Sequence, residues 1–181
     1  MTKGNLALGI SGSPSPTSSS RRLVKRVLDL LAARGFATDV IDLSALPSEA
    51  LLARGEDAAV AGALAKVGDA RVLVVGTPVY RATYTALLKT LFDLMPENYL
   101  SGKVAVLIAT GAAPGHMLAI DHGLRPLVAS LAGVSAATAI YATPGDFVDD
   151  APGEGLSERL TEAADEARRL ALSLAPRDPQ P

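Results

Sequence analysis

At 181 residues and 18.5 kDa, the chain is long enough for one domain with a full core and too short for two ordinary ones. Its formal net charge of -2 and pI near 5.7 give no bulk attraction to nucleic acid. The absence of cysteine excludes disulfides, iron–sulfur clusters and cysteine nucleophiles, so any redox chemistry needs a bound cofactor.

Neither a secretory segment nor a membrane span is predicted. Residues 1–5 lead directly into an apolar strand, and no apolar run reaches the ~18 residues that a membrane helix needs. We therefore expect a cytoplasmic protein with no membrane and no nucleic-acid partner. Residues 1–175 are predicted to form one domain, followed by a disordered tail over 176–181.

Short apolar runs alternate with longer segments of helical period, an order typical of α/β proteins. The predicted strands are 6–10, 38–43, 71–76, 104–109 and 137–141. The first predicted helix follows the serine-rich segment after the first strand and ends at Gly35. Further helices are predicted over about 57–67, 85–95, 116–131 (with a break at Pro126) and 157–174, and a loop over 142–155 precedes the last of them. Because crossovers between parallel strands are right-handed, we expect a doubly wound parallel sheet with helices on both faces.

Ligands of such a sheet bind at the carboxyl ends of its strands. Three loops begin there, at Ser11, Thr77 and Thr110. We expect them to lie side by side and to form the binding site.

The first of these loops is rich in hydroxyl groups. Ser and Thr side chains crowd the segment from Ser11 to Ser20, directly before a helix N-terminus whose free amides face the loop. Neither a P-loop nor a Gly-x-Gly-x-x-Gly motif is present. Hydroxyls and amides together suit a terminal phosphate such as that of flavin mononucleotide (FMN), and the alternative is a flexible Ser/Pro linker.

The other two loops suit the edge of a planar heterocycle. Thr77-Pro78-Val79-Tyr80 follows the most apolar strand and can present backbone amides and carbonyls rigidly. Tyr80 and Tyr84 can line a ring or, equally, pack in a subunit contact. The small residues of Thr110-Gly111-Ala112 permit a close backbone approach.

Several motifs follow one another along residues 6–141. They are Gly12-Ser13-Pro14 with its serine-rich continuation, Thr77-Pro78-Val79-Tyr80, the segments 87–94 (LLKTLFDL) and 100–104 (LSGKV), Ala109-Thr110-Gly111, and 116–121 (HMLAID). In this set and order the chain resembles the NADPH-dependent FMN reductases of the flavodoxin-like superfamily, and within it the sulfonate-utilisation reductases.

The resemblance implies a flavodoxin-like five-stranded sheet of order 2-1-3-4-5 and a two-component system. In such a system the reductase takes a hydride from NADPH (or NADH), reduces FMN and supplies the reduced flavin to a partner monooxygenase. By position, the resemblance places phosphate contacts on Ser11, Ser13, Ser18, Ser19 and Ser20, and ring contacts on Pro78, Val79, Tyr80, Thr110 and Gly111. We expect no catalytic acid or base and no metal, because the flavin carries the chemistry.

The chain departs from its relatives at two places. Many relatives carry an arginine inside the phosphate loop where this chain has Ser15 or Ser19, so Arg21 or Arg22 would be a partial substitute. His122 stands where some sulfonate reductases have a tyrosine that forces a π-bulge.

The sequence is also compatible with two other functions. A reductase that keeps FMN could pass electrons to quinones, azo dyes or metal ions, and a flavodoxin-like carrier could accept electrons from a protein without binding NADPH. Carriers of that kind tend to be strongly acidic, so the net charge of -2 favours an enzyme.

Further features have a structural as well as a functional interpretation. His116 and His122 are expected to be structural hydrogen-bonding residues, and Asp121 with Arg125 an i,i+4 ion pair. The apolar stripe of helix 85–95, which includes Phe92, suggests the contact of a homodimer or homotetramer, and the alternative is that this stripe belongs to the core.

Overall fold

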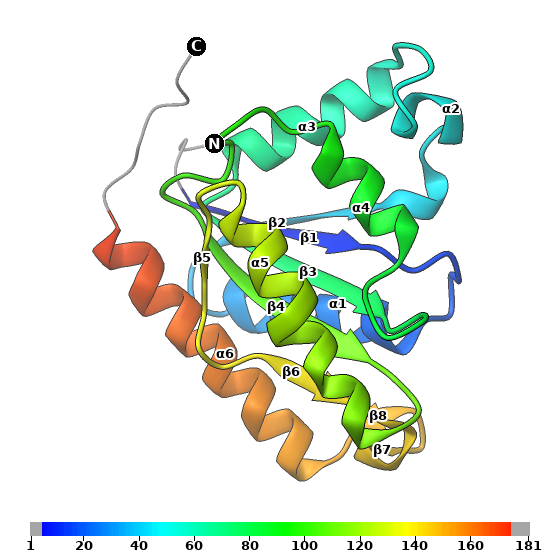
Figure 1. Ribbon diagram of the computed structural model, residues 1–181. Helices are drawn as coiled ribbons and strands as arrows, with labels where there is room; N and C mark the ends of the chain where they lie inside the picture. The colour runs from blue at the N-terminus through cyan, green and yellow to red at the C-terminus, as the bar shows by residue number, and fades with distance from the viewer. Residues whose placement is uncertain (1–4, 175–181) are drawn as a thin grey trace.

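The computed structural model describes residues 5–174, in which strands and helices alternate as the sequence predicts (Figure 1). The strands are β1 Leu6–Ser11, β2 Ala37–Asp42, β3 Val72–Pro78, β4 Val104–Thr110, β5 Val134–Ser135, β6 Ile140–Ala142, β7 Phe147–Val148 and β8 Ala151–Pro152. The α-helices are α1 Ser19–Ala32, α2 Ser48–Leu51, α3 Ala58–Asp69, α4 Ala86–Asp93, α5 Arg125–Ala129 and α6 Glu154–Ser173. The predicted tail over 176–181 lies outside the described residues.

The main sheet is parallel and runs in the order β2-β1-β3-β4-β5, with β6 also paired to β4. This order confirms the predicted doubly wound, flavodoxin-like fold. The register places Ser11 opposite Gly76 of β3, and Pro78 opposite Thr110 of β4. The carboxyl ends of β1, β3 and β4 therefore lie next to one another.

Helices cover both faces of this sheet, as Figure 1 shows: α1 and α6 lie on one face, and α3, α4 and α5 on the other. Alternate residues of the central strands supply the two cores. In β3, Leu73 and Val75 pack toward α3 and α4, whereas Val72 and Val74 pack toward α1 and α6. All four side chains have no exposed area, which explains why this strand is apolar throughout.

The fifth strand differs from the prediction of one segment over 137–141. It is divided into β5 and β6, and side chains from outside the sheet occupy the backbone groups between them. Glu166 of α6 accepts the amides of Ala137 (2.7 Å) and Thr138 (2.8 Å), and Arg125 donates to the carbonyl oxygens of Ala136 (2.7 Å) and Ala137 (2.8 Å). These polar contacts replace the ladder bonds to β4 over that interval.

Residues 142–155 also hold more structure than the predicted loop. A short antiparallel hairpin pairs Phe147 with Pro152 and Val148 with Ala151. The helix that follows begins at Glu154, three residues before the prediction, with Gly153 at its N-cap. The short elements η1 Leu43–Ala45 and α2 were not predicted either.

The predicted helix over 116–131 consists of three successive parts. They are the 3₁₀ turn η2 Pro114–Met117, the π-helix η3 Ile120–Leu124 and α5. The amide of Arg125 bonds to the carbonyl oxygen of Ile120, five residues back. Pro126 has no amide to continue an ordinary α-helical ladder, which accounts for the change of winding beside it.

The apolar stripe of α4 belongs to the core of this chain. Leu88 and Leu91 have no exposed area, Phe92 is 3% exposed and Met95 is 7% exposed. These side chains pack against α3 and the sheet, so the structural interpretation of the stripe holds, and a subunit contact through Phe92 is wrong. Within residues 5–174, the helices fall short of the length and hydropathy needed to cross a membrane.

Candidate functional site

Three loops meet at the carboxyl edge of the sheet, as predicted. We define them as the first loop (residues 11–18), the second loop (77–85) and the third loop (110–113). The amide of Gly12 donates to the carbonyl oxygen of Gly76 at 2.8 Å. The amide of Val79 donates to the carbonyl oxygen of Thr110 at 2.7 Å. The backbone itself thus joins the first loop to β3, and the second loop to the third.

The first loop leads into the N-terminus of α1 without a side-chain cap. Ser18 occupies the N-cap position but makes no capping hydrogen bond, because its Oγ pairs with the Oγ of Ser20 at 2.8 Å. Ser13 is 1% exposed, and its Oγ accepts the amide of Ser15 at 3.1 Å. The amides of the first turn of α1 are therefore left to bind something else.

Ser11 holds a buried hydroxyl without a partner. The residue is 1% exposed, and its Oγ has no hydrogen-bond partner among residues 5–174. A buried hydroxyl that bonds to nothing is costly, so this atom marks a place where a polar group of a ligand can be received.

Close packing beneath the first loop requires glycine. A Cβ at Gly12 would lie 2.8 Å from Cβ of Leu88 and 3.3 Å from the carbonyl oxygen of Gly76. Thr85, the N-cap of α4, fixes this arrangement: its Oγ1 donates to the carbonyl oxygen of Gly12 at 2.5 Å and accepts the amide of Leu88 at 3.1 Å. The first loop is thereby held against the start of α4.

The second loop forms a tight turn. Tyr80 and Thr83 pair through their backbones, and the two residues between them, Arg81 (φ 51°) and Ala82 (φ 69°), have left-handed backbones. The side chain of Tyr80 is 51% exposed. This turn presents an open aromatic ring at the edge of the site.

The third loop is closed from behind by Tyr141. Its hydroxyl donates to the carbonyl oxygen of Ala113 at 2.6 Å, and a Cβ at Gly111 would lie 2.4 Å from that hydroxyl oxygen. Burial, together with the negative charge of Asp146, raises the pKa of Tyr141. The residue at position 111 must therefore be glycine for the loop to reach this position.

The two arginines that follow the first loop take different partners. Nη1 of Arg21 lies 2.6 Å from Oδ2 of Asp42 at the end of β2. Nη2 of Arg22 lies 3.2 Å from Oγ of Ser19 and 3.1 Å from Oδ1 of Asp150 in the β7–β8 hairpin.

The sequence comparisons agree on one family. The profile described as NADPH-dependent FMN reductase matches residues 6–147. The chain belongs to this family.

Individual relatives extend the similarity over most of the chain. An FMN reductase (NADPH) of Pseudomonas putida is 36% identical over 97% of this chain and 92% of the relative. The NADH-dependent FMN reductase SfnF of Pseudomonas fluorescens is 40% identical over 70% of this chain and 68% of the relative. The solved apo form of the NADH:FMN oxidoreductase EMOB is 34% identical and superposes with a TM-score of 0.85, covering 96% of this chain and 91% of that structure.

In this FMN reductase, the structure brings the sequence-predicted residues to one edge of the sheet. Ser11, Ser13, Ser18, Ser19 and Ser20 line the first loop and the start of α1, while Pro78, Val79, Tyr80, Thr110 and Gly111 lie at the ends of β3 and β4. Ser20 is fully buried, and its Oγ pairs with the Oγ of Ser18. Thr85 and the hairpin contact of Arg22 were missed. The residues of each contact lie far apart in the sequence, although a threonine at the start of the predicted helix 85–95 is itself typical of an N-cap.

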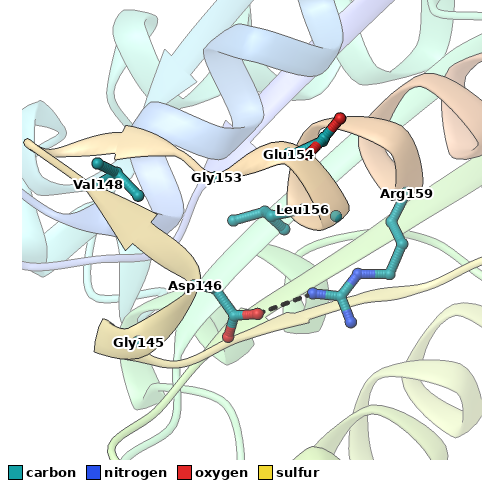
Figure 2. A pocket seen from close by; sticks show the side chains of 8 residues that line it. Gly145, Asp146, Val148, Gly153, Glu154, Leu156 and Arg159 are labelled. Atoms are coloured by element: carbon teal, nitrogen blue, oxygen red, sulfur yellow. Dashed lines mark hydrogen bonds and ion pairs between the residues drawn. The ribbon is translucent and has the colours of Figure 1, made fainter.

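A pocket of about 390 Å³ lies beside this edge, between the hairpin and the N-terminus of α6. Figure 2 shows Asp146 and Arg159 pointing toward each other in it, joined by a hydrogen bond of 3.1 Å. Hydrogen bonds from the amide and hydroxyl of Thr143, and the nearby Arg159, lower the pKa of Asp146 in spite of partial burial. The pocket lining contains none of the ten predicted site residues.

The histidines lie outside the three loops. His122 is exposed within the π-helix, and His116 lies in η2. The predicted ion pair is confirmed, since Nε of Arg125 lies 2.7 Å from Oδ1 of Asp121. Among residues 5–174, no three His, Asp or Glu side chains gather so as to hold a metal ion.

Proposed function

We propose that this chain, an NAD(P)H-dependent FMN reductase, binds FMN at the three loops and releases the reduced flavin to a partner monooxygenase. As an oxidoreductase of this family it has FMN and NAD(P)H as its substrates. The observation that carries the proposed site is the unpartnered hydroxyl of Ser11, buried beside the uncapped N-terminus of α1.

The first loop would hold the phosphate. Ser11, Ser13, Ser18 and Ser19 contribute hydroxyls, and the first turn of α1 contributes amides and the positive end of its dipole. Such a set matches a phosphate monoester, whose oxygens are strong acceptors. Riboflavin lacks this group and would leave the same amides without a partner.

The second and third loops would hold the ring system. Backbone groups of Val79 and Thr110, fixed by their mutual hydrogen bond of 2.7 Å, line its edge, and Gly111 lets the third loop approach closely. Pro78 and Tyr80 supply flat apolar surface.

When bound, FMN takes up a hydride from NAD(P)H, so that the nicotinamide is oxidised by two electrons and the flavin is reduced by two. The residues of this chain then have to orient the two rings and leave one flavin face open, which the exposed turn at Tyr80 allows. No side chain is assigned as an acid or base.

Release of reduced flavin would be favoured by this open geometry. Tyr80 is half exposed, and the third loop offers only Gly and Ala surface beyond Thr110, so stacking on the ring is limited. A ring held chiefly by its edge and phosphate can exchange with free FMN. This supports transfer of reduced FMN to a separate monooxygenase.

We also propose that the reductase forms a homodimer or homotetramer. The contact would involve apolar side chains that remain exposed beyond the third loop, namely Met117 (54%) and Leu118 (55%). Changing Leu118 to Ser should weaken self-association in sedimentation experiments, and a wild type that sediments as a monomer at micromolar concentration would contradict the proposal.

The experiment that tests release measures NADPH oxidation with and without added FMN, after gel filtration of FMN-loaded protein. We expect gel filtration to remove most of the flavin colour and the rate to rise with added FMN. A monooxygenase that depends on reduced FMN should then form product when it is mixed with the reductase. Flavin retained through gel filtration, with turnover of a quinone that needs no added FMN, would contradict release.

A further inference from the structure

Arg22 places a positive charge beside a phosphate loop that contains no arginine. It lies in the first turn of α1, and its guanidinium folds back to within 3.2 Å of Oγ of Ser19 at the start of the helix. Its Cζ lies 5.7 Å from the ring centroid of Phe147 in β7. The ring and the serine hydroxyl together orient the guanidinium next to the first loop.

The neighbouring Arg21 forms a salt bridge away from the first loop. Arg21 pairs with Asp42, whose side chain is 19% exposed and whose Oδ1 also accepts the amide and hydroxyl of Ser44. The partner of Arg22 is Asp150, whose side chain is 86% exposed. Because an ion pair with so exposed a carboxylate is weak, Arg22 can exchange Asp150 for another anion.

The hairpin holds Asp150 in place. Asp149 (φ 46°) and Asp150 (φ 64°) form the tight turn between β7 and β8. Behind the turn, Asp146 accepts the amide of Gly153 on its carbonyl oxygen at 2.9 Å and the guanidinium of Arg159 on its carboxylate (Figure 2). The turn of the hairpin thus presents the carboxylate of Asp150 to Arg22.

We propose that Arg22 is the residue that makes this reductase select phosphorylated flavin, and that Asp150 competes with the flavin phosphate for it. The proposal rests on the proposed function. A phosphate monoester carries more negative charge than a carboxylate, and Asp150 contacts Arg22 only through Oδ1 on Nη2, so the phosphate displaces Asp150 into solvent. The hairpin therefore sets the affinity for FMN without touching the flavin ring.

The test compares dissociation constants for FMN and riboflavin, measured by flavin fluorescence. Arg22→Gln should weaken FMN binding by about tenfold or more and leave riboflavin binding unchanged. Arg22→Lys, which keeps the charge but loses the fork, should fall between. Asp150→Asn should strengthen FMN binding by about two- to fivefold, and the matched control Arg21→Gln should leave both constants as in the wild type.

An unchanged ratio of FMN to riboflavin affinity in Arg22→Gln would overturn the proposal, as would weaker FMN binding in Asp150→Asn. If Arg22→Gln does not fold, Asp150→Asn decides, because it alters only an exposed carboxylate. If the wild type binds FMN and oxidises NADPH but Arg22→Gln keeps the wild-type ratio of FMN to riboflavin affinity, only the inference about Arg22 fails. A wild type that binds no FMN removes the proposed function as well.

Discussion

The hydroxyl of Thr85 donates to the carbonyl oxygen of Gly12 at 2.5 Å, across 73 positions of sequence. Oγ1 of Thr85 also accepts the amide of Leu88 at 3.1 Å. Thr85→Val keeps the shape of the side chain but leaves the carbonyl oxygen of Gly12 and the amide of Leu88 buried and unpaired. It should therefore lower the free energy of unfolding by about 1–3 kcal/mol and weaken FMN binding.

Urea denaturation and flavin titration measure these two effects of Thr85→Val. Thr90→Val in the same helix is the control, because the hydroxyl of Thr90 bonds only to the carbonyl oxygen of Leu87 one turn earlier. That variant should change the stability by less than about 0.5 kcal/mol. Equal stability of Thr85→Val and the wild type would remove the coupling between the first loop and α4.

The serine hydroxyls of the first loop give a second prediction. Ser13→Ala and Ser18→Ala should each weaken FMN binding by about 1–3 kcal/mol, because each removes a group assigned to the phosphate. Riboflavin binding should change little, and Thr17→Ala, at an exposed position of the same loop, serves as the control. If the wild type bound FMN and riboflavin equally, the phosphate assignment would be wrong.

Gly111 and Tyr141 give a prediction that a double-mutant cycle can check. Gly111→Ala forces the Tyr141 hydroxyl, 2.4 Å from the new Cβ, out of its bond with Ala113, at a cost of roughly 1–3 kcal/mol. Tyr141→Phe removes the clashing oxygen, so the double variant should be more stable than additive costs predict. Strictly additive free energies of unfolding would show that the two positions do not interact.

Glu166 makes stability depend on pH. Partial burial opposes its ionisation, but the hydrogen bonds from Thr138 and Ala137 outweigh this and lower its pKa below the ordinary 4.5. The ionised form is favoured in the folded state, so its contribution is present at neutral pH and is lost as the pH falls through the lowered pKa. Glu166→Gln should cost about 1–2 kcal/mol near pH 7.

Urea denaturation of Glu166→Gln at several pH values checks this dependence. The difference from the wild type should shrink as the pH falls from the ordinary value of 4.5 toward the lowered pKa of Glu166, where the folded wild-type carboxylate becomes protonated. Glu162→Gln, at an exposed position of the same helix, is the control and should show no such trend. A difference that stays constant from pH 7 to pH 3 would contradict the role of the Glu166 charge.

The parts of the fold that the sequence predicts are those set by local pattern. The continuous apolar runs of β3 and β4 identify buried parallel strands, because both faces of these strands are covered. The division of the fifth strand follows from Arg125 and Glu166, which arrive from other elements and leave no trace in the strand's own sequence.

The candidate site shows the same contrast between features set by local pattern, which were predicted, and contacts between distant residues, which were missed. The serines of the first loop stand out because they directly follow a strand and precede a helix. The contact of Arg22 with Asp150 joins residues 128 positions apart, and the hairpin that creates it has only two residues in each strand. For Phe92, a local pattern was visible but had two interpretations. An apolar helix face can belong equally to a core or to a subunit interface until its neighbours are known.

The most direct measurement for the central claim is anaerobic stopped-flow mixing of the FMN-loaded protein with NADPH, followed near the absorbance maximum of oxidised flavin. We predict rapid bleaching, because NAD(P)H can reach the open face of a flavin held at the carboxyl edge of the sheet. An electron carrier would be reduced by light or by a protein donor while NADPH left its absorbance unchanged. A complete absence of bleaching at millimolar NADPH would contradict the assignment of this chain as an NAD(P)H-dependent FMN reductase.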